Sequence, residues 1–208
     1  SLPSAKIGHF ATNTELYCCK RDVGINVPAK LHIDFFCFGT HISNKQLALM
    51  WSRKLNILPR FFLLPIIRIN RILSIFIPGG LKHEIHSSDN INVATNQEKI
   101  KTDKDIYNLL EKTEPHLCFT DKEIDKGEKF LRDFGLSENS KIVCLVVRDS
   151  AYNNKYLGNI GINWSYHDYR DQNIENYLPA AEKLAERGYY VFRMGKIVHK
   201  PMNSSNSK

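Results

Sequence analysis

The sequence is short of the motifs that identify common functional classes. Its five cysteines are odd in number and include no C-x-x-C pair, which disfavours both a zinc site and a disulfide framework. No P-loop, G-x-G-x-x-G or G-x-S-x-G pattern occurs. No run of lysine and arginine is long enough for a nucleic-acid-binding tail. We therefore expect no metal ion, no bound cofactor and no nucleic-acid partner.

A clean membrane-spanning segment is also missing. Residues 57–77 are long enough to span a bilayer, but they include three arginines and two prolines. Each arginine near the centre of a spanning helix would cost about 2.5 kcal/mol or more. The first residues contain no apolar core of a secretory signal, and Cys37 and Cys144 occur in apolar strand patterns that suit buried, reduced thiols. These features predict a cytoplasmic protein.

Two interpretations of residues 57–77 stay open. If Pro65 begins a helix, the apolar residues share one face, and Arg68 and Arg71 lie off that face. The apolar face consists of Ile66, Ile69, Leu73 and Phe76. The first interpretation is a helix packed on the protein core. The second is a basic amphipathic patch that rests on an anionic membrane, a partner that the net charge of +7 allows.

Residues 141–147 form the strongest predicted strand of the 208-residue chain. This run is apolar and mostly β-branched, which is typical of a strand buried on both faces of a parallel sheet. A helix over 177–187, with Pro179 in its first turn, and a second strand over 189–194 follow. We predict that the two strands are adjacent and parallel. Together with a strand over 31–38, this alternation predicts an α/β fold.

Three segments match the capping box that begins helices. They start at Thr12, Ser43 and Thr120, and each has Glu or Gln three residues later. The third begins a helix that we expect to end at Gly135, because glycine readily adopts the left-handed conformation of a helix stop. This last helix and its turn mark the expected change of domain.

Charged residues follow the two predicted parallel strands. Arg148 and Asp149 come directly after the first strand, at the edge where open α/β sheets bind their ligands. Arg148 suits a phosphate and Asp149 a sugar hydroxyl, and the alternative is an Arg–Asp ion pair. Arg193 and Gly195 end the second strand, so we expect them on the same edge. This convergence predicts a ligand site.

The crossover after Asp149 is rich in aromatic and polar residues. Tyr152 offers an aromatic face for stacking on a sugar or base, and loop packing is the alternative. His167 and Arg170 add polar groups in the same crossover. Long crossover loops commonly carry function, so these three residues are further substrate-binding candidates.

The segment Ile7-Gly8-His9-Phe10 has the pattern of a strand end, a tight turn and a helix start. Gly8 would let the backbone approach an anionic ligand, and His9 could act as a base or orient a hydroxyl. An ordinary tight turn is the alternative. Asn13 and Glu15, at the start of the expected helix, complete the candidates: Gly8 and Asn13 for substrate binding, His9 and Glu15 for catalysis.

Five stretches of the chain resemble a family of bacterial glycosyltransferases that are encoded with surface-polysaccharide genes. They are residues 6–17 (KIGHFATNTELY), 44–51 (NKQLALMW), 143–152 (VCLVVRDSAY), 164–170 (WSYHDYR) and 188–195 (GYYVFRMG). They follow the family's order and span nearly the whole chain. The resemblance implies a GT-B type fold with two Rossmann-like domains, the first for the acceptor and the second for the nucleotide sugar.

On this resemblance, residues 1–120 are expected to form the acceptor-side domain and 121–140 a connecting helix and turn. Residues 141–208 would be the start of the nucleotide-sugar domain. That domain would stop after two strands, so we expect a fragment that is weakly active or inactive by itself. Its last segment, 196–208, is expected to be poorly packed.

The predicted activity is transfer of a sugar from a nucleotide-sugar donor to a surface-polysaccharide or lipid-linked glycan acceptor. Arg148 and Arg193 would stabilise the diphosphate leaving group, and His9 or Glu15 would deprotonate or position the acceptor hydroxyl. Two alternatives stay open. One is another phosphate-handling α/β transferase, and the other is a non-catalytic peripheral membrane or assembly protein of polysaccharide biosynthesis that uses residues 57–77 as its contact.

Overall fold

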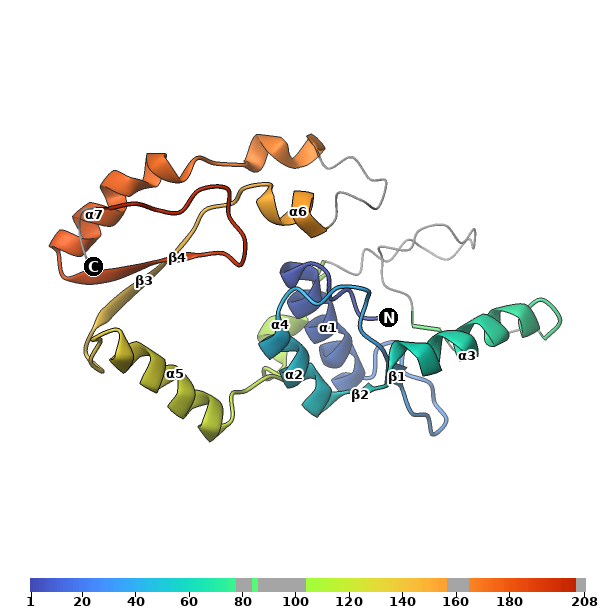
Figure 1. The fold of residues 1–208 in the computed structure, drawn as a ribbon. Coiled ribbons are helices and arrows are strands. Elements are labelled where there is room, and N and C mark those ends of the chain that lie inside the picture. The colour runs from blue at the N-terminus through green and yellow to red at the C-terminus, as the bar shows by residue number, and fades with distance from the viewer. Residues whose placement is uncertain (78–83, 86–103, 157–164, 205–208) are drawn as a thin grey trace. The chain divides into compact units, whose positions relative to one another are not determined.

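The computed structural model describes residues 1–77, 84–85, 104–156 and 165–204 (Figure 1). The chain divides into two compact units, Ser1–Thr120 and Asp121–Lys208, and each is described by itself. The first unit contains α1 (Ile7–Asp22), β1 (Phe35–Phe36), α2 (Lys45–Lys54), β2 (Asn56–Ile57), α3 (Arg60–Leu73) and α4 (Leu109–Lys112). The second contains α5 (Asp121–Asp133), β3 (Lys141–Val146), α6 (Ala151–Tyr156), the 3₁₀ turns η3 (Ser165–Arg170) and η4 (Ile174–Tyr177), α7 (Leu178–Glu186) and β4 (Tyr189–Met194).

Helix α1 begins at Ile7, which is earlier than the capping-box prediction at Thr12. Lys6 has extended backbone angles and its side chain makes no capping hydrogen bond. The extended contact lies further upstream, where Leu2 forms an isolated parallel bridge with Phe38. The predicted strand end and turn at residues 6–10 are therefore wrong, because no residue between Lys6 and Thr12 stops the helix.

The strands of the first unit are very short. β1 and β2 pair in parallel, with Phe35 opposite Asn56 and Phe36 opposite Ile57. The predicted strand over 31–38 is reduced to this pair, and Leu31 is fully exposed. At α2 the cap is Asn44, whose side chain accepts the backbone N–H of Leu47 at 2.9 Å. The predicted capping residue, Ser43, lies one position too early.

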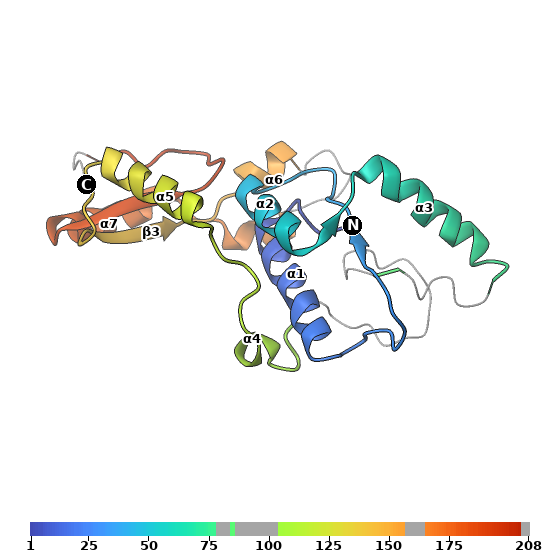
Figure 2. The same ribbon diagram turned by 90° about the horizontal axis from the view of Figure 1, so that it is seen from below.

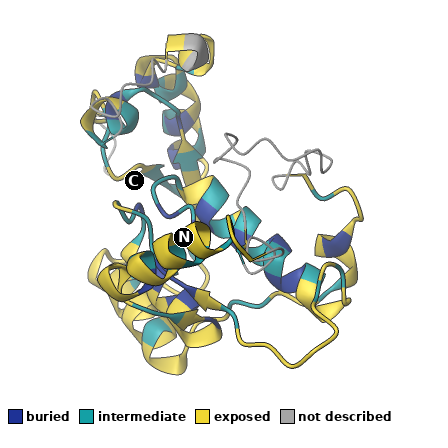
Figure 3. Cartoon of the chain, turned by 90° about the vertical axis from the view of Figure 1, so that its right-hand side faces the viewer, coloured by how far each residue is buried: buried dark blue, intermediate teal, exposed yellow. Residues whose placement is uncertain are grey.

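One small cluster of buried side chains holds the first unit together. Its members come from α1, α2, the strand pair and their flanks: Leu2, Phe10, Cys18, Phe36, Ala48, Trp51 and Leu55. Aromatic rings meet edge to face within it, with centroids 5.9 Å apart for Phe10 and Phe38 and 5.0 Å apart for Tyr17 and Phe36. Figure 3 shows such buried positions in dark blue, and they are sparse beside the exposed ones. The core therefore depends on a few large residues.

The second unit contains the predicted parallel strand pair. β3 and β4 pair in register from Lys141 opposite Tyr189 to Val146 opposite Met194, which confirms that part of the prediction. Two left-handed glycines end the helices that precede the strands. Gly135 has φ +78° after α5, and Gly188 has φ +88° after α7, as their positions in the sequence predicted. Figure 2 shows the same elements from below.

Strand β3 is not buried on both faces, contrary to the prediction. Val146 is 76% exposed and Cys144 is also exposed, whereas Cys37 is fully buried as expected. α7 packs against β4 and buries Ala181 and Ala185. A two-stranded sheet offers one face to this helix, and the described residues leave much of the other face accessible.

Helix α3 differs from its prediction in two ways. It begins at Arg60, so Pro65 lies inside it and does not open it. Most of its apolar side chains are exposed, and Leu63 is its only buried residue among those described. None of the helices in the described part of the chain combines the length and apolar character needed to cross a membrane.

Most residues of the segment after β4 are exposed, but polar contacts anchor it to the rest of the unit. The backbone N–H of His199 donates to Asp149 Oδ2 at 3.0 Å, and Lys200 Nζ donates to Glu175 Oε1 at 3.1 Å. Ser204 Oγ donates to Glu182 Oε1 at 2.9 Å. The prediction of poor packing over 196–208 agrees with the exposure of most of these residues, but it did not include these polar contacts. Residues 205–208 of that range lie outside the described residues.

We expect Phe10→Ala to lower the free energy of unfolding of the first unit by about 3–5 kcal/mol, because it empties a fully buried position in a small core. Urea denaturation followed by circular dichroism measures this. Ile7→Ala is the matched control, since Ile7 lies in the same helix and is exposed. Equal effects of the two substitutions would contradict the assignment of Phe10 to the core.

Candidate functional site

Four of the predicted site residues meet where the parallel strands of the second unit end. Arg148 and Asp149 follow β3, while Arg193 and Gly195 end and follow β4. The parallel register places both carboxyl ends at one edge of the sheet. A long, polar segment that includes η3, η4 and α7 connects the two strands. This edge is the candidate ligand site of the second unit.

Asp149 is committed to structural contacts at this edge. Its Oδ1 accepts the backbone N–H of Ala151 at 3.0 Å, and its Oδ2 accepts that of His199 at 3.0 Å. Arg193 Nη2 lies 3.6 Å from the same Oδ2. The side chain of Asp149 is 13% exposed and that of Arg193 is 10% exposed. Burying either charge without its partner would be costly, so the two stabilise each other. The predicted roles of Asp149 on a sugar hydroxyl and of Arg193 on a phosphate are not supported by this geometry.

Arg148 is the more accessible of the two arginines at the edge. Its side chain is 34% exposed, and its Nε lies 3.3 Å from Asp171 Oδ1. That contact is an ion pair without hydrogen-bond geometry, since Asp171 Oδ1 is among the buried atoms that lack a hydrogen bond. Within the described part of the chain, the Nη nitrogens of Arg148 have no hydrogen bond. Arg148 could therefore contact a phosphate while keeping Asp171 as its neighbour.

Gly195 turns the chain back over this edge. Its φ is +149°, a value that residues with a side chain rarely adopt. A Cβ at this position would lie 2.7 Å from Val198 Cγ1. The glycine thus brings residues 197–199 close to the strand ends, where His199 Nε2 also contacts Ser150 Oγ at 3.1 Å.

Aromatic and basic side chains gather on α6 beside this turn. The rings of Tyr152 and Tyr156 are 5.1 Å apart, and Lys196 Nζ lies 5.4 Å from the centre of the Tyr156 ring. Burial raises the pKa of Tyr152, so the phenol stays neutral at physiological pH. Tyr152 thus packs on its neighbour, which is the alternative that the sequence left open.

The remaining two loop candidates, His167 and Arg170, both belong to η3. Arg170 lies at the end of η3, and its guanidinium stands 5.3 Å from the centre of the Tyr169 ring. His167 lies inside η3. Two contacts join the residues after η3 to the strand edge. Gln172 N–H donates to the carbonyl oxygen of Arg148 at 2.9 Å, and Asp171 Oδ1 lies 3.3 Å from Arg148 Nε.

The amino-terminal candidates all lie within α1. Gly8 is an exposed helical residue, and a Cβ there would meet no atom within 4 Å, so no close backbone approach requires glycine. His9 and Glu15 are six residues apart and so point about 120° away from each other around the helix. Asn13 Nδ2 is buried without a hydrogen bond in the described structure. The predicted anion-binding turn at Gly8 is therefore wrong.

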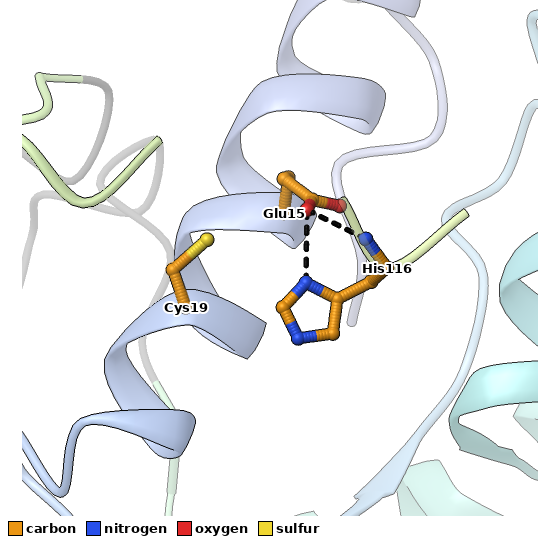
Figure 4. A group of neighbouring side chains, drawn as sticks. All are labelled: Glu15, Cys19 and His116. Atoms are coloured by element: carbon orange, nitrogen blue, oxygen red, sulfur yellow. Dashed lines mark hydrogen bonds and ion pairs between the residues drawn. The ribbon is translucent and has the colours of Figure 1, made fainter. Parts of the chain in front are cut away.

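Glu15 belongs to a polar network that the sequence did not predict (Figure 4). Its Oε1 accepts both the backbone N–H of His116 at 3.0 Å and a contact from His116 Nδ1 at 2.8 Å. His116 Nε2 lies 2.8 Å from Asp22 Oδ2. Beside them, Thr113 Oγ1 lies 3.0 Å from Cys19 Sγ. The helical spacing of Glu15, Cys19 and Asp22 put them near one another, but nothing in the sequence indicated that His116 joins them.

The ligand atoms of Glu15, Cys19 and His116 lie within 4.8 Å of one another, so the donor types and spacing resemble those of a metal site. The protein groups already satisfy one another, however. Both His116 ring nitrogens contact carboxylates, and one Glu15 oxygen receives two contacts. A metal ion would have to break these interactions. The network is best explained as a polar clasp that fixes the 113–117 segment on α1.

A shallow depression opens on the first unit at the amino ends of β1 and β2. Arg21, His32, Asp34, Phe36 and Asn56 are among the residues that line it. The Tyr17 hydroxyl donates a short hydrogen bond to Asp34 nearby, and burial followed by this contact raises the pKa of Tyr17. The depression lies at the strand edge opposite to the one where parallel sheets bind ligands.

Comparisons of the chain with protein-family models, with curated proteins and with solved structures found no match.

We expect His116→Ala to lower the free energy of unfolding by about 1–3 kcal/mol, because it leaves the half-buried Glu15 carboxylate without its partner. Thermal melting measures this. His32→Ala is the control, since the one ion pair that His32 forms with a described residue is long, at 3.9 Å. Zinc should not raise the melting temperature. A zinc-dependent rise that Cys19→Ser abolishes would identify a metal site and contradict the clasp.

Proposed function

We propose that this protein is a glycosyltransferase of the GT-B type that uses a nucleotide-sugar donor and a surface-polysaccharide or lipid-linked glycan acceptor. The observation that carries the proposal is the accessible Arg148 at the carboxyl edge of the parallel β3–β4 pair. Open α/β sheets bind phosphate-containing ligands at this edge. The sequence stretches that resemble the glycosyltransferase family include both strand ends.

In this proposal Arg148 binds the diphosphate of the donor through its Nη nitrogens. It stabilises the negative charge that develops on the leaving group when the glycosidic bond breaks. The Asp149–Arg193 pair and the Gly195 turn have a positioning role, because they fix the strand ends on which Arg148 stands. No metal ion is needed for charge stabilisation of this kind.

On the acceptor side, His9 is the better of the two candidate bases. Glu15 is held in the clasp with His116, whereas His9 is half-buried and takes part in no such network among the described residues. The proposed role of His9 is to accept a proton from the acceptor hydroxyl. The proposed location is cytoplasmic, which is consistent with five free cysteines.

We further propose that additional structure completes the donor site. The exposed β3 face supports this, since apolar residues such as Val146 normally require a cover in a nucleotide-binding domain. The chain by itself is then expected to bind nucleotide weakly, with a Kd of about 1 mM or above.

The decisive experiment is an NMR titration of the chain with uridine, guanosine and cytidine diphosphates and their sugars. We expect one nucleotide to shift the backbone amides of residues 148–150 and 195–199. Arg148→Ala should weaken this binding about tenfold or more, because a charge-assisted phosphate contact is lost. Arg187→Ala is the control, since Arg187 is an exposed arginine of the same unit.

The outcomes separate the alternatives. Binding of inorganic diphosphate and of every nucleotide with equal strength would favour another phosphate-handling transferase. The absence of any shift with the whole panel would contradict the proposal and favour a non-catalytic assembly protein. A shift that Arg148→Ala leaves unchanged would mean that Arg148 is only a partner of Asp171.

A further inference from the structure

Helix α3 presents its apolar side to solvent. At about 100° per residue, its exposed apolar residues fall on one continuous arc that is about 140° wide. The arc consists of Phe61, Phe62, Pro65, Ile66, Ile69, Ile72 and Leu73. The half-buried and buried positions, Leu63, Leu64, Ile67 and Asn70, lie on the opposite side. We call the exposed side the α3 arc.

The exposed apolar surface continues past the end of the helix. Ile75, Phe76 and Ile77 are all exposed, and turn hydrogen bonds to the carbonyl oxygens of Ile72 and Leu73 hold them against α3. A contiguous apolar surface of this extent is unusual on a soluble domain and marks an interaction site. A helix of 14 residues is about 21 Å long, which is shorter than the roughly 30 Å hydrocarbon core of a bilayer.

The stretch of sequence that contains α3 is basic. Residues 35–83 contain seven lysines and arginines and no aspartate or glutamate. The rest of the chain has 22 basic and 22 acidic residues, so this segment accounts for the whole net charge of +7. Its described basic residues are all exposed: Lys45, Arg53, Lys54, Arg60, Arg68 and Arg71.

Two arginines of α3 carry charge that no carboxylate neutralises in the described structure. Arg71 forms a two-point pair with Glu84, with Nε to Oε1 at 3.0 Å and Nη2 to Oε2 at 2.7 Å. Arg60 and Arg68 have no such partner among the described residues. Arg68 lies at the edge of the α3 arc, next to Phe61 when the helix is viewed down its axis.

We propose that the α3 arc lies in the interface of an anionic membrane, parallel to its plane. The apolar arc enters the boundary between headgroups and acyl chains, and Arg68 at the edge of the arc contacts anionic headgroups. The excess of one charge favours this occupant over a second copy of the chain, because two copies would bring like charges together. The inference does not depend on the transferase activity, although it would bring a lipid-linked acceptor to the first unit.

Sedimentation with sucrose-loaded vesicles tests the proposal. The chain should bind vesicles of phosphatidylcholine mixed with phosphatidylglycerol, bind phosphatidylcholine alone much less, and lose affinity as salt is raised. Ile69→Glu, in the middle of the α3 arc, should weaken binding at least tenfold. Leu31→Glu is the matched control, since it makes the same change at an exposed apolar position of the same unit.

The electrostatic part has its own pair of variants. Arg68→Gln should weaken binding to anionic vesicles about fivefold, which corresponds to about 1 kcal/mol for one cation at such a surface. Arg187→Gln removes the same charge in the second unit and should have no effect. An Ile69→Trp variant should show a blue-shifted emission with anionic vesicles, whereas Leu31→Trp should not.

Three results would overturn the proposal. The first is no binding to anionic vesicles, and the second is binding that Ile69→Glu leaves unchanged. The third is a concentration-dependent dimer, seen by analytical ultracentrifugation, that Ile69→Glu dissociates while vesicle binding is absent; the α3 arc would then be a contact between copies. Nucleotide titration is a separate measurement, so failure of the transferase proposal would leave this inference standing.

Discussion

The carboxylate of Asp149 holds the second unit together at the edge where its parallel strands end. It joins four pieces of chain: the end of β3, the first residue of α6, Arg193 on β4 and the backbone at His199. A buried charge of this kind is tolerated only when it is paired and hydrogen-bonded, and removing one partner of such a pair costs about 3–5 kcal/mol. The same constraint makes Asp149 and Arg193 unsuitable as ligand groups and leaves Arg148, whose side chain is 34% exposed, as the more accessible of the two arginines.

The first unit depends on a different constraint, the scarcity of large buried side chains. Phe10, Trp51 and their neighbours fill the space between α1, α2 and the short strands. The buried cluster of the described first unit includes no residue of α3, and the apolar arc of α3 is exposed. An apolar helix face that the core does not cover needs another apolar environment. The sequence around this helix has no acidic residue from 35 to 83, which favours a membrane with anionic headgroups.

Charge is distributed in opposite ways over the two proposed binding surfaces. At the strand edge each arginine has a carboxylate beside it, Asp171 for Arg148 and Asp149 for Arg193. A diphosphate there would be recognised by geometry and by the remaining donors of Arg148. Around α3 the cations outnumber the carboxylates, so attraction is long-ranged and sensitive to salt. The positive net charge of the chain therefore supports the proposed membrane contact, and it contributes little to the proposed donor site.

The sequence by itself determined the parallel strand pair, the glycine stops after α5 and α7, and the convergence of Arg148, Asp149 and Arg193, because apolar runs, turn residues and parallel strand ends follow local rules. It did not determine where α1 and α3 begin, since a capping pattern or a proline is a weak signal once a helix can extend past it. Tertiary structure alone decided the partners of each charge. Examples are the pairing of Arg148 with Asp171, the clasp of Glu15 with His116 and the exposure of the α3 arc. Each depends on how distant segments of the chain pack, and no local sequence pattern encodes that packing.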